Sequence, residues 1–202
     1  MNIILASSSP RRKSILSGMF GSFSVLPPSI DETHHPDETP TAFALRIAEE
    51  KCRAVLESLP VRKRPALIIA ADTIVTIDGR IIGKPADFND AVRMISELSG
   101  RTHRVITGLS LTRAGNNEAD SGPLTASEVT EVSFRRLDHD GIISYLNNIE
   151  YLDKAGSYAI QEHGSMIVEG YRGSVTNIIG FPLRLFFSML VEMGLVRELF
   201  NI

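Results

Sequence analysis

The sequence predicts an α/β fold with a mixed, partly antiparallel twisted sheet and flanking helices. Short apolar runs typical of strands alternate along the chain with amphipathic stretches of helical spacing. The run at 67–71 is apolar throughout, as in a strand that is buried on both faces. Asp78 and Gly79 lie between two apolar stretches and form a strong two-residue hairpin signal. Since a hairpin joins antiparallel strands, the sheet is not expected to be purely parallel.

The first part of the chain predicts a strand, a capped helix and then a longer helix. Ser9 suits the N-cap position and Pro10 the first helical position. Thr39 and Pro40 open the longer, amphipathic helix in the same way. The elements expected in this part are strand 3–6, helix 11–19, strand 23–26, a polar loop 27–40, helix 40–59, a surface loop 61–65, strand 67–71, and hairpin strands 73–77 and 80–83.

The second part of the chain predicts three more helices and four more strands. Asp87 caps the first of these helices, Gly100 ends it, and Asp138 starts the next. The segment 114–123, which is rich in turn residues, separates two long strands and suggests no function. The elements expected here are helix 87–100, strands 102–112 and 128–136, helix 138–146, strands 157–161 and 166–171, and a last apolar helix 182–194.

Composition excludes several classes of protein. The 202 residues favour one domain, 1–202. A net charge of −3 argues against a general nucleic-acid-binding surface. The single cysteine, Cys52, excludes an intramolecular disulfide framework and a cysteine-only zinc site. No apolar stretch reaches the roughly 18 residues of a membrane span, so we expect a soluble cytoplasmic protein without a membrane partner.

Ser7, Arg11 and Arg12 mark a candidate phosphate site at the start of the first helix. Two arginines in the first helical turn face the positive end of the helix dipole, which is unfavourable unless an anion lies there. Free backbone N–H groups, serine hydroxyls and guanidinium groups together would bind phosphate. Two solvated arginines on a surface helix are the alternative.

Carboxylates form the second candidate group. Asp72 follows the apolar run 67–71 and is expected at the carboxyl end of that strand, where ligands bind in open α/β sheets. It could hold a divalent metal or act as a base toward water. Glu32, in the acidic loop, could share Mg²⁺ with phosphate oxygens. His34 and His35 are expected to be solvated loop residues, because no spaced third ligand accompanies them.

Lys51, Lys84 and Gln161 are weaker signals when each is taken alone. The lysines could face a polyphosphate or could lie on the surface, and neither belongs to a Walker motif. Gln161 is expected at the end of strand 157–161, where its amide could match the mixed donor and acceptor edge of uracil or thymine.

Six motifs, taken together and in order, resemble the Maf family of nucleoside triphosphate pyrophosphatases over nearly the whole chain. They are SSSPRR at 7–12, ADTIV at 71–75, GKP at 83–85, LSG at 98–100 followed by His103, DKAGSYAIQ at 153–161 and GFPL at 180–183. The resemblance implies an elongated, two-lobed, inosine-triphosphatase-like fold around a central cleft. It also implies hydrolysis of a nucleoside triphosphate between its α and β phosphorus atoms, with a divalent cation, Mg²⁺ or Mn²⁺, and a homodimer.

The resemblance also implies roles for individual residues. Asp72 falls on the family's proton acceptor, and Glu32 on an acidic position that helps both the metal and catalysis. Ser7, Arg11, Arg12, Lys51 and Lys84 fall on phosphate-binding positions. Thr73 and Gln161, with Arg11, fall on positions tied to the choice of base.

Thr73 and Gln161 resemble the branch of the family that acts on dTTP and UTP, in a role of nucleotide-pool sanitation. Ala159 and Glu162 stand where glycine is more usual, and Phe181 replaces a leucine. Two alternatives stay open. One is a pyrophosphatase for 7-methyl-GTP or another modified nucleotide, and the other is a regulatory nucleotide-binding module linked to cell division.

Overall fold

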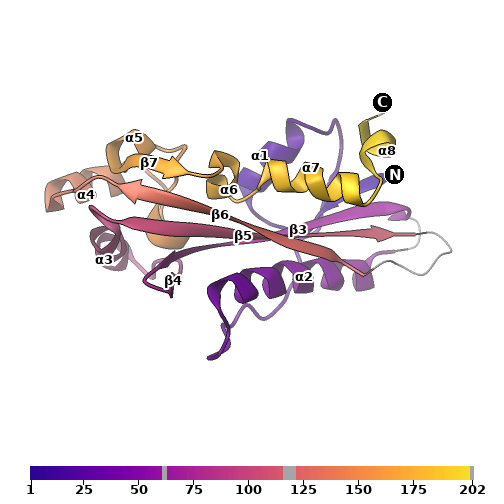
Figure 1. Cartoon of the computed structure of the whole chain (residues 1–202), viewed down its shortest axis with the longest axis horizontal. Helices are drawn as coiled ribbons and strands as arrows, with labels where there is room; N and C mark the ends of the chain where they lie inside the picture. Colours follow the sequence, from indigo (N-terminus) through magenta and orange to yellow (C-terminus); the bar gives the residue numbers. More distant parts are fainter. Residues whose placement is uncertain (61–62, 116–121, 201–202) are drawn as a thin grey trace. The chain divides into compact units, whose positions relative to one another are not determined.

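The computed structural model describes residues 1–60, 63–115 and 122–200. Most of the predicted loop 114–123, and residues 61–62 of the predicted loop 61–65, lie outside this part. Within it, one seven-stranded sheet has the order β2-β1-β3-β5-β6-β7, with β4 paired to β3 (Figure 1). The strands are β1 (Asn2–Leu5), β2 (Ser24–Val25), β3 (Ala66–Ile77), β4 (Arg80–Ile82), β5 (Thr102–Ala114), β6 (Leu124–Phe134) and β7 (Val168–Arg172).

Helices flank this sheet, so the predicted mixed α/β class is confirmed. β1 runs parallel to β2 and β3, whereas β4 and β7 pair antiparallel with β3 and β6. The helices are α1 (Pro10–Ser17), α2 (Pro40–Ser58), α3 (Phe88–Leu98), α4 (His139–Leu146), the short 3-10 turn η2 (Ala155–Ser157), α5 (Gly164–Ile167), α6 (Val175–Ile179), α7 (Leu183–Glu192) and α8 (Val196–Phe200).

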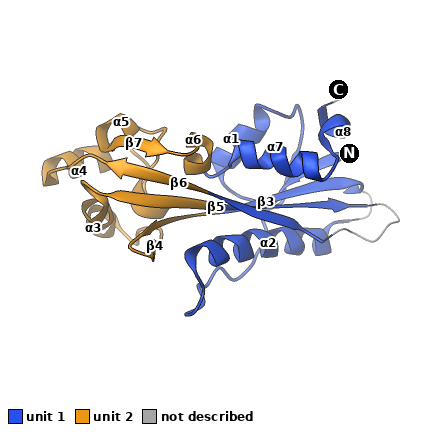
Figure 2. Cartoon of the chain, in the orientation of Figure 1, with its two compact units in different colours: residues 1–72, 107–128, 180–202 blue, residues 73–106, 129–179 orange. Residues whose placement is uncertain are grey.

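The chain divides into two compact units (Figure 2). Unit 1 comprises residues 1–72, 107–128 and 180–202, and unit 2 comprises residues 73–106 and 129–179. The strands β3, β5 and β6 contribute residues to both units. The expectation of a single two-lobed domain around a cleft stays a prediction.

In unit 1, alternation along β3 decides which helix covers which face of the sheet. Ile68 and Ala70 pack with Cys52 and Val55 of α2. Leu67 and Ile69, on the opposite face, pack with the cluster that includes residues of α1 and α7. Successive strand residues point to opposite faces, so the apolar run of β3 buries both of its sides. Figure 2 shows α2 on one side of the blue part of the sheet and α1 and α7 on the other.

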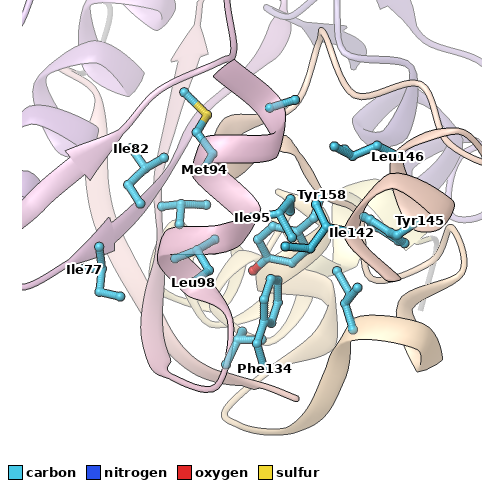
Figure 3. Close-up of a cluster of buried hydrophobic side chains, with 14 of the residues drawn as sticks. Ile77, Ile82, Met94, Ile95, Leu98, Phe134, Ile142, Tyr145, Leu146 and Tyr158 are labelled. Atoms are coloured by element: carbon cyan, nitrogen blue, oxygen red, sulfur yellow. The ribbon is translucent and has the colours of Figure 1, made fainter. Parts of the chain in front are cut away.

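In unit 2, the core lies between the sheet and the helices α3 and α4. Figure 3 shows Ile95 of α3 beside the Tyr158 ring, with the ring of Phe134 of β6 next to it. Met94 and Leu98 of α3 belong to the same buried cluster. Ile142 and Tyr145 of α4 complete the same cluster. The spacing of the α3 residues is the helical stripe that the sequence shows.

Two predicted strand assignments are wrong, and a third is shifted. The predicted strand 67–71 and first hairpin strand 73–77 are one strand, so Asp72 lies within β3 rather than at a carboxyl end. The predicted strand 157–161 consists of the end of η2 and a turn, and Gln161 lies in that turn. Gly156 has a φ of 69°, which turns the chain out of extended structure at that point. The predicted strand 166–171 begins as α5 and becomes β7 only at Val168.

His103 of β5 is a buried titratable side chain in the unit 2 core. Its Nε2 lies 2.8 Å from the Tyr158 hydroxyl oxygen, and the rings of Phe134 and Tyr158 meet it edge to face. Its Nδ1 is buried without a hydrogen-bond partner among the described residues. Burial lowers the pKa of His103 to about 4, since the charged ring would lose its hydration there.

We expect this histidine to make unfolding easier in mild acid. Its pKa in the folded protein, about 4, is below the 6.5 of an ordinary histidine. Between these two pH values the unfolded chain binds more protons, so the free energy of unfolding falls as the pH falls. From pH 7 to pH 4.5 we expect the free energy of unfolding to fall by about 2 kcal/mol, and guanidinium chloride titrations at the two pH values will check this. His103→Leu should remove most of this dependence of the free energy of unfolding on pH. An equal dependence in the variant and the parent protein would contradict the assignment of the effect to His103.

Candidate active site

The beginning of α1 carries the serine and arginine residues of the predicted phosphate site. Ser9 caps the helix, with its side chain accepting from the Arg12 backbone N–H. The Ser7 hydroxyl accepts from the Ser9 backbone N–H at 3.2 Å and from Arg12 Nη1 at 3.1 Å. A serine oxygen that accepts twice still has its own proton to donate. The first turn of α1 carries Arg11 and Arg12 and no acidic residue, as predicted.

Arg12 is a buried arginine held from two directions. Its Nη1 reaches Ser7, and its Nε donates to the Gly180 carbonyl at 2.8 Å. Burial lowers the pKa of the Arg12 guanidinium, and the nearby Asp72 carboxylate opposes that effect. An arginine nevertheless stays protonated in a protein, so the site contains a fixed positive charge beside Ser7.

Lys51 of α2 brings two carboxylates together. Its ammonium nitrogen lies 2.7 Å from Asp72 Oδ1 and 2.9 Å from Glu32 Oε1. The side chains of Lys51 and Asp72 are 11% and 12% exposed, whereas that of Glu32 is 54% exposed. A single positive charge between the two carboxylates offsets their mutual repulsion.

The strand and the helix both place this group by their periodicity. Asp72 continues the row Ile68, Ala70 along β3, so its side chain points to the face that α2 covers. Lys51 lies on the buried stripe of α2 beside Cys52, which packs on the same face. Asp72 and Glu32 also act electrostatically on the Arg12 guanidinium, and the serine–arginine group and the carboxylate group both lie in unit 1.

These residues of unit 1 combine groups that can bind an anion with carboxylates that can accept a proton or bind a cation. Arg12 and Ser7 supply positive charge and hydroxyl hydrogen bonding for phosphate oxygens. Asp72 and Glu32 supply oxygen donors, and Mg²⁺ typically takes one or two carboxylates plus substrate phosphates and water. Among the described residues no group of three acidic, histidine or cysteine side chains could hold a metal by itself.

The remaining predicted site residues, Thr73, Lys84 and Gln161, belong to unit 2. Lys84 and Gln161 are exposed, and Thr73 is half-buried. Their participation in one site with Ser7, Arg11, Arg12, Glu32, Lys51 and Asp72 stays a prediction.

Within unit 2, the backbone brings the GKP and DKAGSYAIQ motifs together. The Gly156 N–H donates to the Gly83 carbonyl at 2.9 Å, and Gly83 directly precedes Lys84. Gly156 has a positive φ, and a Cβ there would lie 3.2 Å from the side chain of Val75. The short turn that follows Gly156 and the turn that follows β4 are therefore fixed to one another.

The turn that carries Gln161 is held on both sides. The Tyr145 hydroxyl accepts from the Ala159 N–H at 3.1 Å and donates to the Ala159 carbonyl at 3.3 Å. On the other side, the buried Lys154 ammonium lies 3.3 Å from Glu162 Oε2 and 2.9 Å from Asp153 Oδ1. The carboxylate of Glu162, the residue that departs from the usual glycine, is thus engaged by a lysine of its own unit.

Sequence reasoning missed two residues that organise the site, Gly180 and Arg46. Gly180 holds Arg12 through its carbonyl, and its place in the GFPL motif was the available signal. Arg46 contacts the acidic loop from α2, and nothing in the pattern of the helix distinguishes it from other charged positions. The apolar helix predicted at 182–194 is present as α7, and its residues Phe186, Met189 and Leu190 are buried.

Comparison with known proteins places these observations in a sequence family. A family model described as Maf-like protein matches residues 2–193. The dTTP/UTP pyrophosphatase of Thermococcus kodakarensis is 41% identical over 192 residues, which cover 95% of this chain and 96% of that protein. The dTTP/UTP pyrophosphatase of Syntrophomonas wolfei is 40% identical over 190 residues, covering 94% and 96%. That of Pyrococcus furiosus is 40% identical over 192 residues, covering 95% of each.

Among solved structures, the chain is similar to that of the Staphylococcus aureus Ham1 protein. The TM-score is 0.46 and the sequence identity is 14%, and the match covers 96% of this chain and 100% of that chain. In the part of the chain that the structure describes, no helix is both long enough and apolar enough to cross a bilayer.

Proposed function

The chain belongs to the Maf family, and from this premise we propose that it hydrolyses dTTP and UTP to the nucleoside monophosphate and pyrophosphate. The observation that carries the proposal is the site in unit 1. A buried arginine and a serine at a helix start lie in the electrostatic reach of a carboxylate that is held by a lysine. The names of the relatives support the choice of dTTP and UTP.

In the proposed reaction, Asp72 accepts the proton of the attacking water. The water oxygen forms a bond to phosphorus as the α–β phosphoanhydride bond breaks and pyrophosphate leaves. Lys51 holds Asp72 by Oδ1, which orients the other carboxylate oxygen for the proton. Ser7, Arg11, Arg12 and Lys84 bind phosphate oxygens and neutralise the charge that develops on the leaving pyrophosphate.

Asp72 and Glu32 are the residues that would hold the divalent cation, Mg²⁺ or Mn²⁺. The cation supplies charge neutralisation of the triphosphate when bound. Both carboxylates converge on one positive charge, the Lys51 ammonium, and this convergence supports their proposed role as cation ligands. The binding of phosphate by Ser7 and Arg12 does not depend on it.

The base is proposed to be read by Thr73 and Gln161 with Arg11. The Gln161 amide offers a donor and an acceptor, which match the N–H and the carbonyls of uracil or thymine. Its exposed position, on a turn that Tyr145 and Lys154 hold in place, supports this role. A fixed turn reduces the entropy lost when the base binds.

A turnover panel tests the proposal. The purified protein with Mg²⁺ or Mn²⁺ is offered each common nucleoside triphosphate and 7-methyl-GTP, and the release of pyrophosphate and phosphate is measured. Pyrophosphate from dTTP and UTP, with little from purines, supports the proposal. Preference for 7-methyl-GTP or another modified nucleotide contradicts the base assignment and leaves the pyrophosphatase reaction in place. Tight binding without turnover favours a regulatory module, and the mass of the protein in solution tests the homodimer.

We expect Gln161→Glu to change the base preference more than the rate of the chemical step. Glutamate only accepts hydrogen bonds, so it loses the donor to a pyrimidine carbonyl and instead suits the N–H groups of a guanine edge. The ratio of kcat/KM for dTTP to that for 7-methyl-GTP should fall about tenfold or more. Gln161→Asn is the matched control, because it keeps the amide with a shorter stem. An unchanged ratio in Gln161→Glu would remove Gln161 from base reading.

A further inference from the structure

Arg46 of α2 makes a many-sided contact with the loop that carries Glu32. Its Nε and Nη2 donate to the two carboxylate oxygens of Glu38, each at 2.8 Å. The same Nη2 donates to the Thr33 carbonyl at 3.0 Å. A guanidinium that binds a carboxylate with two parallel bonds fixes direction as well as distance. The loop is therefore fastened to the helix at two points, Thr33 and Glu38.

These contacts lie next to both members of the Lys51–Glu32 pair. Thr33 directly follows Glu32 on the loop. Arg46 Nη1 also lies 3.2 Å from Glu50, which directly precedes Lys51 on α2. One guanidinium thus connects the backbone beside Glu32 with the helical turn that presents Lys51.

The surroundings of Arg46 make this contact stronger than an ordinary surface ion pair. The side chains of Arg46 and Glu38 are 21% and 10% exposed. The Arg46 guanidinium lies 5.4 Å from the centre of the Phe43 ring, and the His34 ring of the loop meets the same phenylalanine at 5.2 Å. The pairing with Arg46 lowers the pKa of Glu38 to about 2, so Glu38 stays ionised throughout the neutral range.

Glu32 needs such an anchor because its own contact is weak. Its side chain is 54% exposed, and an exposed lysine–glutamate pair contributes little to the stability of a structure by itself. The Lys51 ammonium also binds Asp72, so Lys51 does not by itself fix where the loop lies. The position of the Glu32 carboxylate beside Asp72 is therefore set by the fastening of the loop.

We propose that Arg46 is a positioning residue: by fastening the loop 31–38 to α2, it holds the Glu32 carboxylate beside Lys51 and Asp72. The inference rests on the proposed function in one respect, the use of Glu32 during turnover. Arg46 itself is assigned no contact with substrate. Its contribution is expected to pass through Glu32 alone.

Arg46→Met tests the proposal, with Arg53→Met as its matched control. Methionine keeps a long side chain over Phe43 and removes the guanidinium. Arg53 lies on the same helix and pairs with Glu49, but both of those side chains are exposed. We expect kcat with dTTP to fall by about 10–100-fold in Arg46→Met, the usual loss for a residue that orients a site group. KM should change less, because Ser7 and Arg12 are untouched, and Arg53→Met should behave as the parent protein.

A double-mutant cycle separates positioning from a general structural effect. In a Glu32→Gln background, Arg46→Met should lower kcat by less than about twofold. The effects of two substitutions are not additive when both residues act through one group. Full additivity of the two losses would overturn the proposal. Arg46→Lys keeps the charge without the paired hydrogen bonds and should restore only part of kcat.

A second readout does not depend on turnover. A glutamate-specific protease should cleave the loop after Glu32 and Glu38 several-fold faster in Arg46→Met than in Arg53→Met, because cleavage follows local opening. Glu38→Gln removes the same contact from the loop side, if Arg46→Met does not fold. If dTTP and UTP are not hydrolysed at all, the proposed function fails, but the protease assay still tests whether Arg46 holds the loop on α2. Equal cleavage rates in Arg46→Met and Arg53→Met would overturn that role of Arg46.

Discussion

Asp72→Asn is expected to lower kcat for dTTP and UTP by a factor of about 10²–10⁴, the usual loss when a general base is removed. Asparagine has nearly the same shape, but its amide does not take up a proton from water. Its oxygen can still accept from Lys51, which lies 2.7 Å from Asp72 Oδ1. The fold should therefore persist while turnover falls. Pyrophosphate release, measured beside thermal unfolding, checks both statements.

The matched control for this substitution is Asp78→Asn. Asp78 lies at the tip of the β3–β4 hairpin with a φ of 51°, a conformation that asparagine adopts readily, and it pairs on the surface with Arg101. We expect its turnover to match that of the parent protein. Unchanged turnover in Asp72→Asn would exclude Asp72 as the proton acceptor. Equal losses in both variants would point to a general effect of removing a negative charge.

Gly108→Ala is expected to destabilise the protein strongly. A Cβ on Gly108 of β5 would lie 2.2 Å from the Ala44 carbonyl oxygen and 2.6 Å from its carbonyl carbon. Both are backbone atoms of α2, so no side chain can rotate away to make room. The helix would have to leave the sheet, and it carries Lys51 and Arg46 with it. We expect a loss of about 3 kcal/mol or more in the free energy of unfolding.

The measurement is a pair of denaturant titrations with a turnover assay. A loss of that size should lower the melting temperature by about 10 °C for a chain of this length. Gly21→Ala, also in unit 1, is the control, because a Cβ there would meet nothing within 4 Å. Its stability should stay within about 0.5 kcal/mol of the parent. If Gly108→Ala unfolds like Gly21→Ala, then α2 does not approach β5 as closely as described.

The local sequence was sufficient to predict most helices because their signals are local. Ser9, Asp87 and Asp138 were predicted as helix starts, and each side chain accepts from a backbone N–H of its helix. The apolar stripe of α3 is buried as its spacing indicates. The short helices α5, α6 and α8 were not predicted, because each spans only four or five residues, too few to show a periodic stripe.

The errors arose where distant residues override a local pattern. An aspartate after an apolar run suggests the end of a strand, yet β3 continues through Asp72 because Lys51, on another element, compensates its charge. The segment 157–161 has the composition of a strand, but the positive φ of Gly156 and the hydrogen bonds of Tyr145 to Ala159 turn it away. A strand needs a partner, and composition alone does not provide one.

The sequence by itself determined which side chains are available, and its six ordered motifs identified the family. The structure placed Asp72 within β3, and alternation along that strand then directs its side chain to the face that α2 covers. Only the tertiary structure decided which charges meet. Gly180 binds Arg12 from 168 residues away, Lys51 joins Asp72 to Glu32, and Arg46 fastens the loop that carries Glu32. Hydrogen bonds and ion pairs act over a few ångströms in space, whereas the sequence records only distance along the chain.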